Sequence, residues 1–401
     1  MPILSSKELR QSELWLRRAH HILAWILHFY IHTHPPARPD ENSDIIIPAP
    51  LTLPLLRIST LLELPPVVSY ADSVLYNWDF ACPPSSPNEI PTTSNLRCQT
   101  LFTQTLTESE FFLVSARIEL IGVRALDIMR TTMNEMFVGD DVAARRITGF
   151  LWELQEVVTR MKETLLGLKA TGCDPDIFYN EVRPWLAGCD SNKRNWIFEG
   201  LTEAVERYER EEDEEMICEP TELSGPSAGQ SSLIHSLDIF LGVDKYSHSV
   251  VTIGGKNTPE PSPDTVAQKS SFLHRMQLYM PRHHRRFLQH LTSNPRPLRD
   301  FVVTRAELGT PNEENKELLA AYNAAVKALK EFRDAHMMTV SLYIISPAAK
   351  ARKVQSETIA RDEKEMNEEK ERKPLKGTGG TNLVQFLKGV RDQTKNAILP
   401  C

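Results

Sequence analysis

The sequence lacks a long hydrophobic run: the longest near the N-terminus, Ile22–Ile31, covers ten residues, whereas a membrane-spanning helix needs about 20. The N-terminal segment also lacks the flanks and the small-residue cleavage site of a signal peptide. Cysteine is scarce, with six residues and no CxxC or metal-finger spacing, so neither a disulfide framework nor a zinc finger is expected. These absences predict a cytoplasmic protein that does not enter membranes.

An excess of positive charge is also absent. The chain carries 46 lysine and arginine residues against 53 aspartate and glutamate residues, a formal net charge of −7. This balance argues against nucleic acid or an anionic membrane as a partner. One basic cluster, Arg282–Arg286, continues into apolar residues at helical spacing, and we interpret it as a solvated helix face. No Ser-His-Asp triad and no pair of catalytic carboxylates emerges from the sequence.

Alternating strand patterns are scarce, and nearly every periodic segment has helical spacing, so we predict an all-α protein. A proline-rich loop is expected to reach Pro54. One long helix is expected to begin with a capping box at Thr107-x-x-Glu110. The predicted helices are Glu13–Ile31, Tyr70–Trp78, Thr107–Met136, Asp141–Lys169, Asp174–Gly188, Gln230–Leu241, His274–Tyr279, His283–Leu291, Lys316–Ile344 and Asn382–Leu399.

Two domains are predicted. Residues 1–67 are expected to hold part of a small helical domain and a connecting segment, and residues 68–401 a large helical domain. Residues 350–375 are strongly charged and poor in large apolar side chains, so we expect a mobile surface loop there. The charge run at residues 207–215 is interpreted as a solvated insertion or a helix end.

His336 is the first candidate functional residue. It lies in the helical stretch Lys316–Ile344, which contains no proline or glycine, and apolar residues flank it on the same face: Leu329, Phe332, Val340 and Tyr343. An imidazole in such surroundings suits a flat apolar cofactor with one open axial metal position, as in haem proteins with a proximal histidine. A hydrogen-bonded core histidine is the alternative, and the pattern alone does not decide between them.

Two glycine-rich loops could approach a ligand closely. Ser224–Ser232 precedes a helix, and its small residues would present backbone N–H groups to a flat ligand. It has neither the lysine of a Walker A loop nor the strand context of a dinucleotide fingerprint. Lys376–Thr381 follows the charged segment and suits a lid that closes on a substrate. A flexible connector is the alternative for both.

Two further patterns could line a pocket. Phe111 and Ser115 are four residues apart and share a helix face, although core packing explains such a stripe equally well. Arg183 follows Phe178 and Tyr179 by about one turn and could bind a carboxylate through two parallel hydrogen bonds. A surface charge near a helix end is the alternative for this arginine.

Taken in order, these segments resemble the indoleamine 2,3-dioxygenases, particularly their fungal members. The resemblance covers residues 16–396, and the SAGQSS and KGTGGT elements, with a histidine helix between them, are specific to that family. The matching segments are LELPPVVSYADSVLYNW (62–78), FFLVSARIE (111–119), FYNEVRPWLAG (178–188), SGPSAGQSSLIHSLDIFLG (224–242), YMPRHHRRFLQHLTSNPRPLRDFV (279–302) and KGTGGTNLVQFLKGVR (376–391).

The resemblance implies an all-helical fold that holds haem b in the large domain. It implies insertion of both atoms of O2 across the C2–C3 bond of the indole of L-tryptophan. The product is N-formylkynurenine, the first intermediate of the kynurenine pathway, which feeds NAD synthesis. It further implies an electron donor that keeps the haem ferrous, no nucleic-acid or membrane partner, and a monomer.

The resemblance also assigns roles by position. His336 matches the proximal iron ligand, Arg333 and Asp238 match a pair on the propionate side of the haem, and Ser227 and Ala228 match the loop at the haem edge. Phe178, Tyr179 and Arg183 match the aromatic pair and the arginine near the substrate carboxylate, and Thr378 matches the closing loop near the substrate ammonium. The indole pocket is matched by Tyr70, Ser73, Val74, Phe111, Phe112, Ser115 and Leu186.

The chain departs from the family pattern in two places that bear on function. Family members usually carry a longer segment before Leu16, so we expect a shortened small domain and a weaker cover over the substrate pocket. Pro226 stands where glycine is frequent, which stiffens the loop and removes one N–H donor. A haem-binding protein of the same fold without turnover is the main alternative, and a helical scaffold without cofactor is the second.

Overall fold

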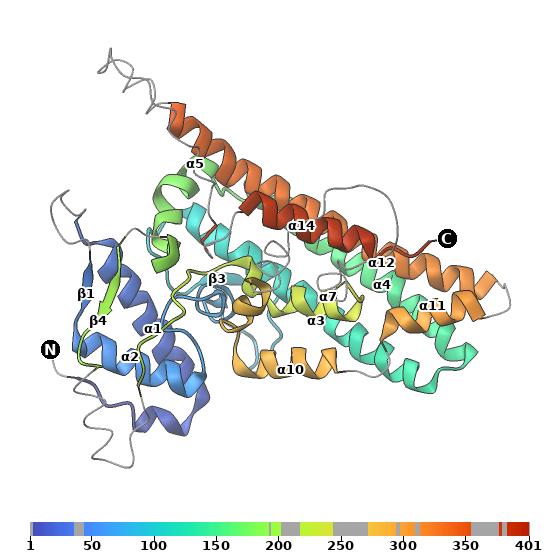
Figure 1. Ribbon diagram of the computed structural model, residues 1–401, viewed down its shortest axis with the longest axis horizontal. Helices are drawn as coiled ribbons and strands as arrows, with labels where there is room; N and C mark the ends of the chain where they lie inside the picture. The colour runs from blue at the N-terminus through green and yellow to red at the C-terminus, as the bar shows by residue number, and fades with distance from the viewer. Residues whose placement is uncertain are drawn as a thin grey trace, which may run out of the picture.

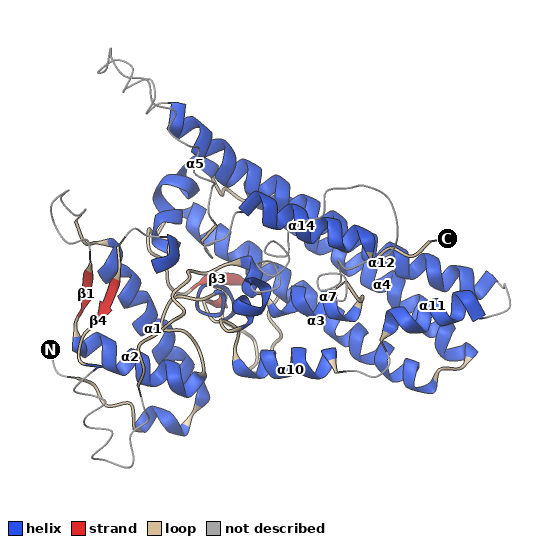
Figure 2. Cartoon of the chain, in the orientation of Figure 1, coloured by secondary structure: helices blue, strands red, loops and turns tan. Residues whose placement is uncertain are grey.

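The computed structural model describes residues 3–35, 44–191, 194–201, 217–243, 272–293, 297–308, 313–353, 377–378 and 383–400. Nearly all regular structure in these ranges is helical (Figure 1, Figure 2), which confirms the predicted all-α class. Strands in these ranges form two short pairs. β1 (Ile45–Ile47) runs parallel to β4 (Trp196–Phe198), and β2 (Trp78–Phe80) runs antiparallel to β3 (Leu96–Cys98).

Three long helices form the main body. α3 (Leu106–Val138) and α4 (Asp141–Leu166) pack along each other and are joined by a tight turn at Gly139, whose φ of +71° favours glycine. α12 (Glu313–Val340) packs along α4 (Figure 1). Ala321 and Ala325 on α12 are fully buried, and because alanine is small it lets neighbouring backbones approach closely. The helix of His336 is therefore anchored in the centre of the core.

α3 begins earlier than the predicted capping box. Thr105 is the N-cap, and its side chain accepts a hydrogen bond from the Glu108 backbone N–H. The Glu108 carboxylate does not complete a capping box, because it accepts hydrogen bonds from the N–H groups of Phe102 and Thr103 instead. The predicted start at Thr107 was wrong because the preceding loop, and not the helix pattern alone, fixes where the cap lies.

The first part of the chain contains α1 (Glu13–His32), as predicted, and α2 (Ala49–Leu62), which was not predicted. The expected proline-rich loop up to Pro54 was wrong. Pro50 lies in the first turn of α2, where a missing N–H costs no helical hydrogen bond. Pro54 does remove one bond, but the helix buries a continuous apolar stretch around it that outweighs this loss: Leu51, Leu53, Leu55, Leu56, Ile58 and Leu62.

The residues between these helices and the core form short turns. The predicted helix Tyr70–Trp78 is a π-helical turn at Ala71–Leu75, and Trp78 already belongs to β2. The predicted helix after Asp174 is confirmed as a run of α5 (Pro175–Ile177), a π-helical turn (Phe178–Val182) and a 3-10 turn (Arg183–Leu186). Other short 3-10 turns are Glu8–Gln11, Gly167–Lys169, Cys189–Ser191 and Ala228–Gln230.

The remaining helices cover the core. They are α7 (Ser232–Phe240), α10 (Arg282–Thr292), α11 (Leu298–Leu308) and α14 (Leu383–Asn396), with a further helical segment at residues 272–277. α11 was not predicted. α12 continues through a π-helical turn (Ser341–Ile345) into a helix up to residue 353. The charged loop predicted at 350–375 therefore begins as helix, and the rest of it lies outside the described residues, as does the charge run at 207–215.

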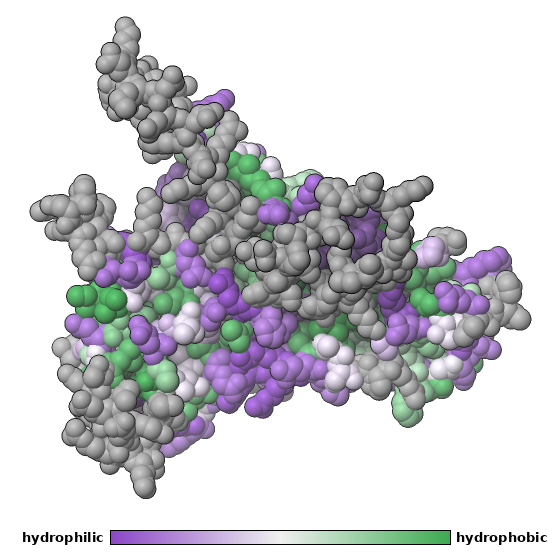
Figure 3. All heavy atoms as spheres, viewed as in Figure 1, coloured by the Kyte–Doolittle hydropathy of each residue, from purple (hydrophilic) through white to green (hydrophobic). Residues whose placement is uncertain are grey.

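The basic cluster on α10 is solvated in part: His283 and Arg286 are exposed, whereas Arg282, His284 and Arg285 are half-buried. Hydrophilic side chains gather over α10 in the space-filling view (Figure 3). Arg282 pairs with Glu13 at 2.8 Å, and Arg285 pairs with Glu63 at 2.8 Å. Among the described residues, no helix is both long and apolar enough to cross a membrane.

Candidate functional site

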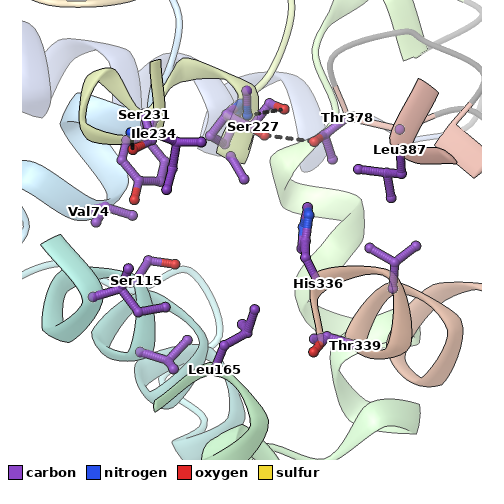
Figure 4. A pocket seen from close by; sticks show the side chains of 18 of the residues that line it. Val74, Ser115, Leu165, Ser227, Ser231, Ile234, His336, Thr339, Thr378 and Leu387 are labelled. Carbon is purple, nitrogen blue, oxygen red and sulfur yellow. Dashed lines mark hydrogen bonds between the residues drawn. The ribbon is translucent and has the colours of Figure 1, made fainter. Parts of the chain in front are cut away.

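A cavity of about 270 Å³ lies between α3, α7, α12 and α14. With the exception of Tyr179, every residue that the sequence analysis assigned to a site lines this cavity. These residues come from segments up to about 300 positions apart in the chain, and the fold brings them around one space (Figure 4). The spatial grouping of the predicted residues is therefore confirmed, whereas their roles stay predictions.

His336 is directed into the cavity from α12, across from Val74 and Ser115 (Figure 4). Burial is the main cause that lowers the pKa of its imidazole, to about 4, and the neighbouring Arg333 guanidinium adds to the effect. The imidazole is therefore neutral at physiological pH, which is the form that binds a metal ion. A neutral nitrogen donor facing an apolar space is the donor that haem iron takes as its axial ligand, so these residues fit haem.

Arg333, one turn before His336, is held by a buried ion pair. One guanidinium nitrogen donates to both carboxylate oxygens of Asp238 on α7, at 2.7 and 2.6 Å. A second guanidinium nitrogen donates to the Thr394 hydroxyl on α14. Arg333 is only 7% exposed, so the three helices that surround the His336 side of the cavity are joined by one desolvated, charge-assisted network.

One part of the cavity wall is aromatic. Phe111 on α3 lies against Phe178, with ring centroids 4.3 Å apart, and Phe178 contacts the ring of Tyr343 at 5.8 Å. The Tyr343 hydroxyl donates to the Cys173 backbone carbonyl at 2.8 Å. These contacts fix the ring planes, so the wall presents a rigid slot for a flat apolar group.

The first glycine-rich loop forms another wall. Pro226, Ser227, Ala228 and Gly229 line the cavity, which supports a binding loop over a flexible connector. The loop passes directly against the backbone of residues 186–188, and the Cys189 N–H donates to the Leu223 carbonyl at 2.9 Å. A Cβ atom at Gly225 would lie 2.0 Å from the Leu186 carbonyl oxygen. Glycine is therefore required there by backbone contact.

We expect the Gly225→Ala variant to lower the free energy of unfolding by about 1–3 kcal/mol, the usual cost of overpacking. The clashing atoms belong to the backbone and cannot rotate away. Gly229→Ala is the matched control, because its Cβ would meet Met276 and Phe272 only at ordinary contact distances of 3.4 and 3.5 Å. Urea unfolding of both variants measures the difference, and equal destabilisation would contradict the close approach of the two backbones.

Arg183 lines the cavity, but Tyr179 does not. The Tyr179 ring instead lies beside the guanidinium group of Arg183, 5.5 Å from its central carbon. Thr378 also lines the cavity, and its hydroxyl donates to the Pro226 carbonyl at 2.7 Å. Of the second glycine-rich loop, only Gly377 and Thr378 lie within the described residues.

Sequence reasoning missed several residues of the cavity wall. Glu119, one turn after Ser115, lines the cavity from α3, and its four-residue spacing from Ser115 was an available signal. Gln230 does not line the cavity, but it accepts a hydrogen bond from the Tyr70 N–H at 2.8 Å, and no sequence signal pointed to that contact. α14 adds residues at the helical spacing i, i+3, i+4 and i+7: Leu383, Phe386, Leu387 and Val390.

An all-helical fold in which the neutral His336 imidazole faces a cavity with aromatic walls is the arrangement expected of a haem-binding helical protein. Comparison with known proteins identifies the family. A family model described as indoleamine 2,3-dioxygenase matches residues 1–397. The chain therefore belongs to the indoleamine 2,3-dioxygenase family.

Curated relatives agree with this assignment. Rat indoleamine 2,3-dioxygenase 1 is 32% identical over the whole chain, which spans 83% of the rat protein. The indoleamine 2,3-dioxygenase of Saccharomyces cerevisiae is 32% identical over 94% of the chain and 77% of the yeast protein. An indoleamine 2,3-dioxygenase of Aspergillus candidus is 32% identical over the whole chain and 85% of its own length.

The family membership establishes the activity. The protein is a haem-dependent dioxygenase that inserts O2 across the C2–C3 bond of the indole of L-tryptophan and forms N-formylkynurenine. This reaction is the first step of the kynurenine pathway, and haem is the cofactor.

Proposed function

We propose that the cavity holds both haem and L-tryptophan, with His336 as the proximal ligand of the haem iron. The observation that carries the proposal is the neutral His336 imidazole directed into a cavity with aromatic walls (Figure 4). Arg333 and Asp238 would hold α7 and α12 on the propionate side, and Ser227 and Ala228 would lie at the haem edge.

Bound haem supplies the iron that binds and activates O2. The protein side chains bind the substrate, orient it and exclude water. Ser115 lies on the wall across from His336 (Figure 4), where a hydroxyl group offers no strong base. This agrees with a reaction in which the pocket must fit the substrate and exclude water near the iron, and in which an acid–base catalyst matters less. The proposed indole slot consists of Tyr70, Ser73, Val74, Phe111, Phe112, Ser115, Phe178 and Leu186.

The polar end of tryptophan needs charged or polar partners. We propose that Arg183 binds the carboxylate, because it is the arginine of the cavity wall near Phe178, and Tyr179 supports its guanidinium group from behind. Thr378, which reaches the cavity through its hydrogen bond to Pro226, would lie near the ammonium group. Tyr179 would thus act on the substrate through Arg183 and not by direct contact.

We expect the Arg183→Gln variant to weaken the binding of L-tryptophan by about tenfold or more, the effect of losing a hydrogen bond between charged groups. Binding of tryptamine, which has the same indole and no carboxylate, should change by less than about threefold. The measurement is a titration of the haem-loaded protein, followed by the haem absorption spectrum.

Arg160→Gln serves as the matched control, because Arg160 is exposed on α4. It should leave the affinity for both ligands unchanged. An equal loss for tryptophan and tryptamine in the Arg183 variant would show a loss of pocket shape and would contradict carboxylate binding by this residue.

We further propose that the protein acts as a cytoplasmic monomer that receives electrons from a donor which keeps the haem ferrous. The scarcity of cysteine supports the location, and the net charge of −7 disfavours nucleic acid as a partner. No observation on the described cavity residues favours the alternative of a haem protein without turnover.

A further inference from the structure

We propose that Glu119 is a positioning residue of the tryptophan pocket, which fixes the Tyr70 ring and the start of α7 through one carboxyl oxygen. This inference rests on the proposed indole slot and extends it to a residue outside the assigned set. Glu119 lies on α3, one turn after Ser115, and lines the cavity.

The contacts of Glu119 join three segments of the wall. Its Oε1 atom accepts a hydrogen bond from the Tyr70 hydroxyl at 2.9 Å and another from the Ser231 hydroxyl at 2.6 Å. Tyr70 comes from the turn before the π-helical segment, and Ser231 is the N-cap of α7. One oxygen atom of α3 therefore holds both neighbouring segments in place.

Tyr70 is fixed at both ends by this arrangement. Its backbone N–H donates to the Gln230 side-chain oxygen at 2.8 Å, and the Gln230 amide donates to the Gly225 carbonyl at 3.0 Å. The hydroxyl end has Glu119 as its acceptor. Because a ring held at the backbone can still rotate about its side-chain bonds, the hydroxyl contact is the one that sets the position of the ring in the pocket.

The surroundings of Glu119 disfavour its charged form. No cation forms an ion pair with it among the described residues. Burial raises the pKa of its carboxyl group, and the hydrogen bonds from Ser231 and Tyr70 offset this only in part. The role of Glu119 in the pocket wall is therefore that of a hydrogen-bond acceptor, through Oε1.

Glutamine keeps the hydrogen-bond acceptor of Glu119 and has nearly the same shape. In Glu119→Gln, the amide oxygen can accept the same two hydrogen bonds, and the amide nitrogen takes the place of Oε2. Glu119→Leu keeps a similar volume but removes the acceptor, which leaves two buried hydroxyl groups without their partner. Both variants lack the ionisable group, and only Glu119→Leu lacks the hydrogen-bond acceptor, so their comparison isolates the effect of losing the two hydrogen bonds.

The test compares both variants with the unaltered protein, each loaded with haem. We expect Glu119→Leu to raise KM for L-tryptophan about tenfold, with kcat changed less than about threefold. The Tyr70 ring would no longer be held in place, whereas the residues proposed to hold the haem would be unaltered. The preference for tryptophan over a ring-methylated tryptophan should fall, since a free Tyr70 ring can move aside. Glu119→Gln should keep KM and the preference close to those of the unaltered protein.

Binding of tryptophan, measured by the haem absorption spectrum, gives a readout independent of turnover. Asp127 on α3, whose side chain is 49% exposed, supplies the control Asp127→Asn, which should change nothing. If Glu119→Leu does not fold, Tyr70→Phe removes the same hydrogen bond from its other end, and it should raise KM and relax the preference in the same way.

An unchanged KM and preference in Glu119→Leu, or in Tyr70→Phe where that variant is used, would overturn the proposal. So would a Glu119→Gln variant as impaired as Glu119→Leu. These outcomes differ from failure of the proposed function, in which the unaltered haem-loaded protein would not bind tryptophan at all.

Discussion

Replacement of His336 by alanine is expected to lower haem affinity by at least about 100-fold, more than the loss of an outer-shell partner of a metal ligand costs. The imidazole of His336 is directed into the cavity (Figure 4), and without it the proposed bond between the protein and the iron is lost. Haem content per chain after gel filtration and the Soret absorption band measure the effect. Dioxygenase activity should fall with the haem content.

Two further variants make this prediction specific. His274→Ala is the matched control, because His274 is exposed, and it should keep its full haem content. His336→Gly should regain the Soret band when imidazole is added, because the free base can occupy the space of the missing side chain. Full haem retention with an unchanged spectrum in His336→Ala would contradict the assignment of this residue as the iron ligand.

Replacement of His20 by alanine is expected to lower the free energy of unfolding by about 3–5 kcal/mol, the cost of leaving a buried charge without its partner. His20 on α1 and Asp72 are both buried and lie 2.9 Å apart, Nδ1 to Oδ1. The Nε2 atom of His20 lies 3.1 Å from the Pro65 carbonyl oxygen. Both neighbours are acceptors, so both ring nitrogens carry a proton and the ring is cationic.

The pH dependence of this contribution follows from the pKa directions. Burial lowers the pKa of His20, but the Asp72 carboxylate outweighs burial and raises it above 6.5. Burial raises the pKa of Asp72, but His20 outweighs it and the pKa falls below 3.8. The His20 contribution is lost as pH rises through its raised pKa, and the Asp72 contribution as pH falls through its lowered pKa.

The pair therefore stabilises the fold most between about pH 4 and pH 6.5, between the two unfolded-state values. Urea unfolding of the unaltered protein and of His20→Ala across pH 4 to 9 should show a difference that is largest in this window and shrinks at high pH. His34→Ala, just beyond the end of α1, is the control. A difference that is small and independent of pH would contradict the buried ion pair.

The long helices could be predicted from the sequence because their signals are local. The stretch around His336 contains no proline or glycine, and its apolar spacing predicted a helix that the structure confirms as α12. α2 could not be predicted, because its stability comes from burial of Leu55 and Ile58 against other segments, which overrides the local effect of Pro54. The pairing of β1 with β4 joins residues about 150 positions apart, and no local pattern reports such a contact.

The candidate site was predictable to the extent that its residues occur in family motifs. The residues that the motifs named, except Tyr179, do line one cavity. The polar contacts between them were not predictable, because they depend on distance in space. Glu119 meets Ser231 across 112 positions of sequence, and no motif indicated it. The Arg333–Asp238 pair, 95 positions apart, is the exception, because the family resemblance named it.

The most direct test of the central claim is turnover of L-tryptophan by the haem-loaded, reduced protein under ¹⁸O₂, with the product analysed by mass spectrometry. The account predicts N-formylkynurenine that carries both labelled oxygen atoms, and no product from the His336→Ala variant. A product with one labelled oxygen, or haem-loaded protein that binds tryptophan and forms no product, would contradict it.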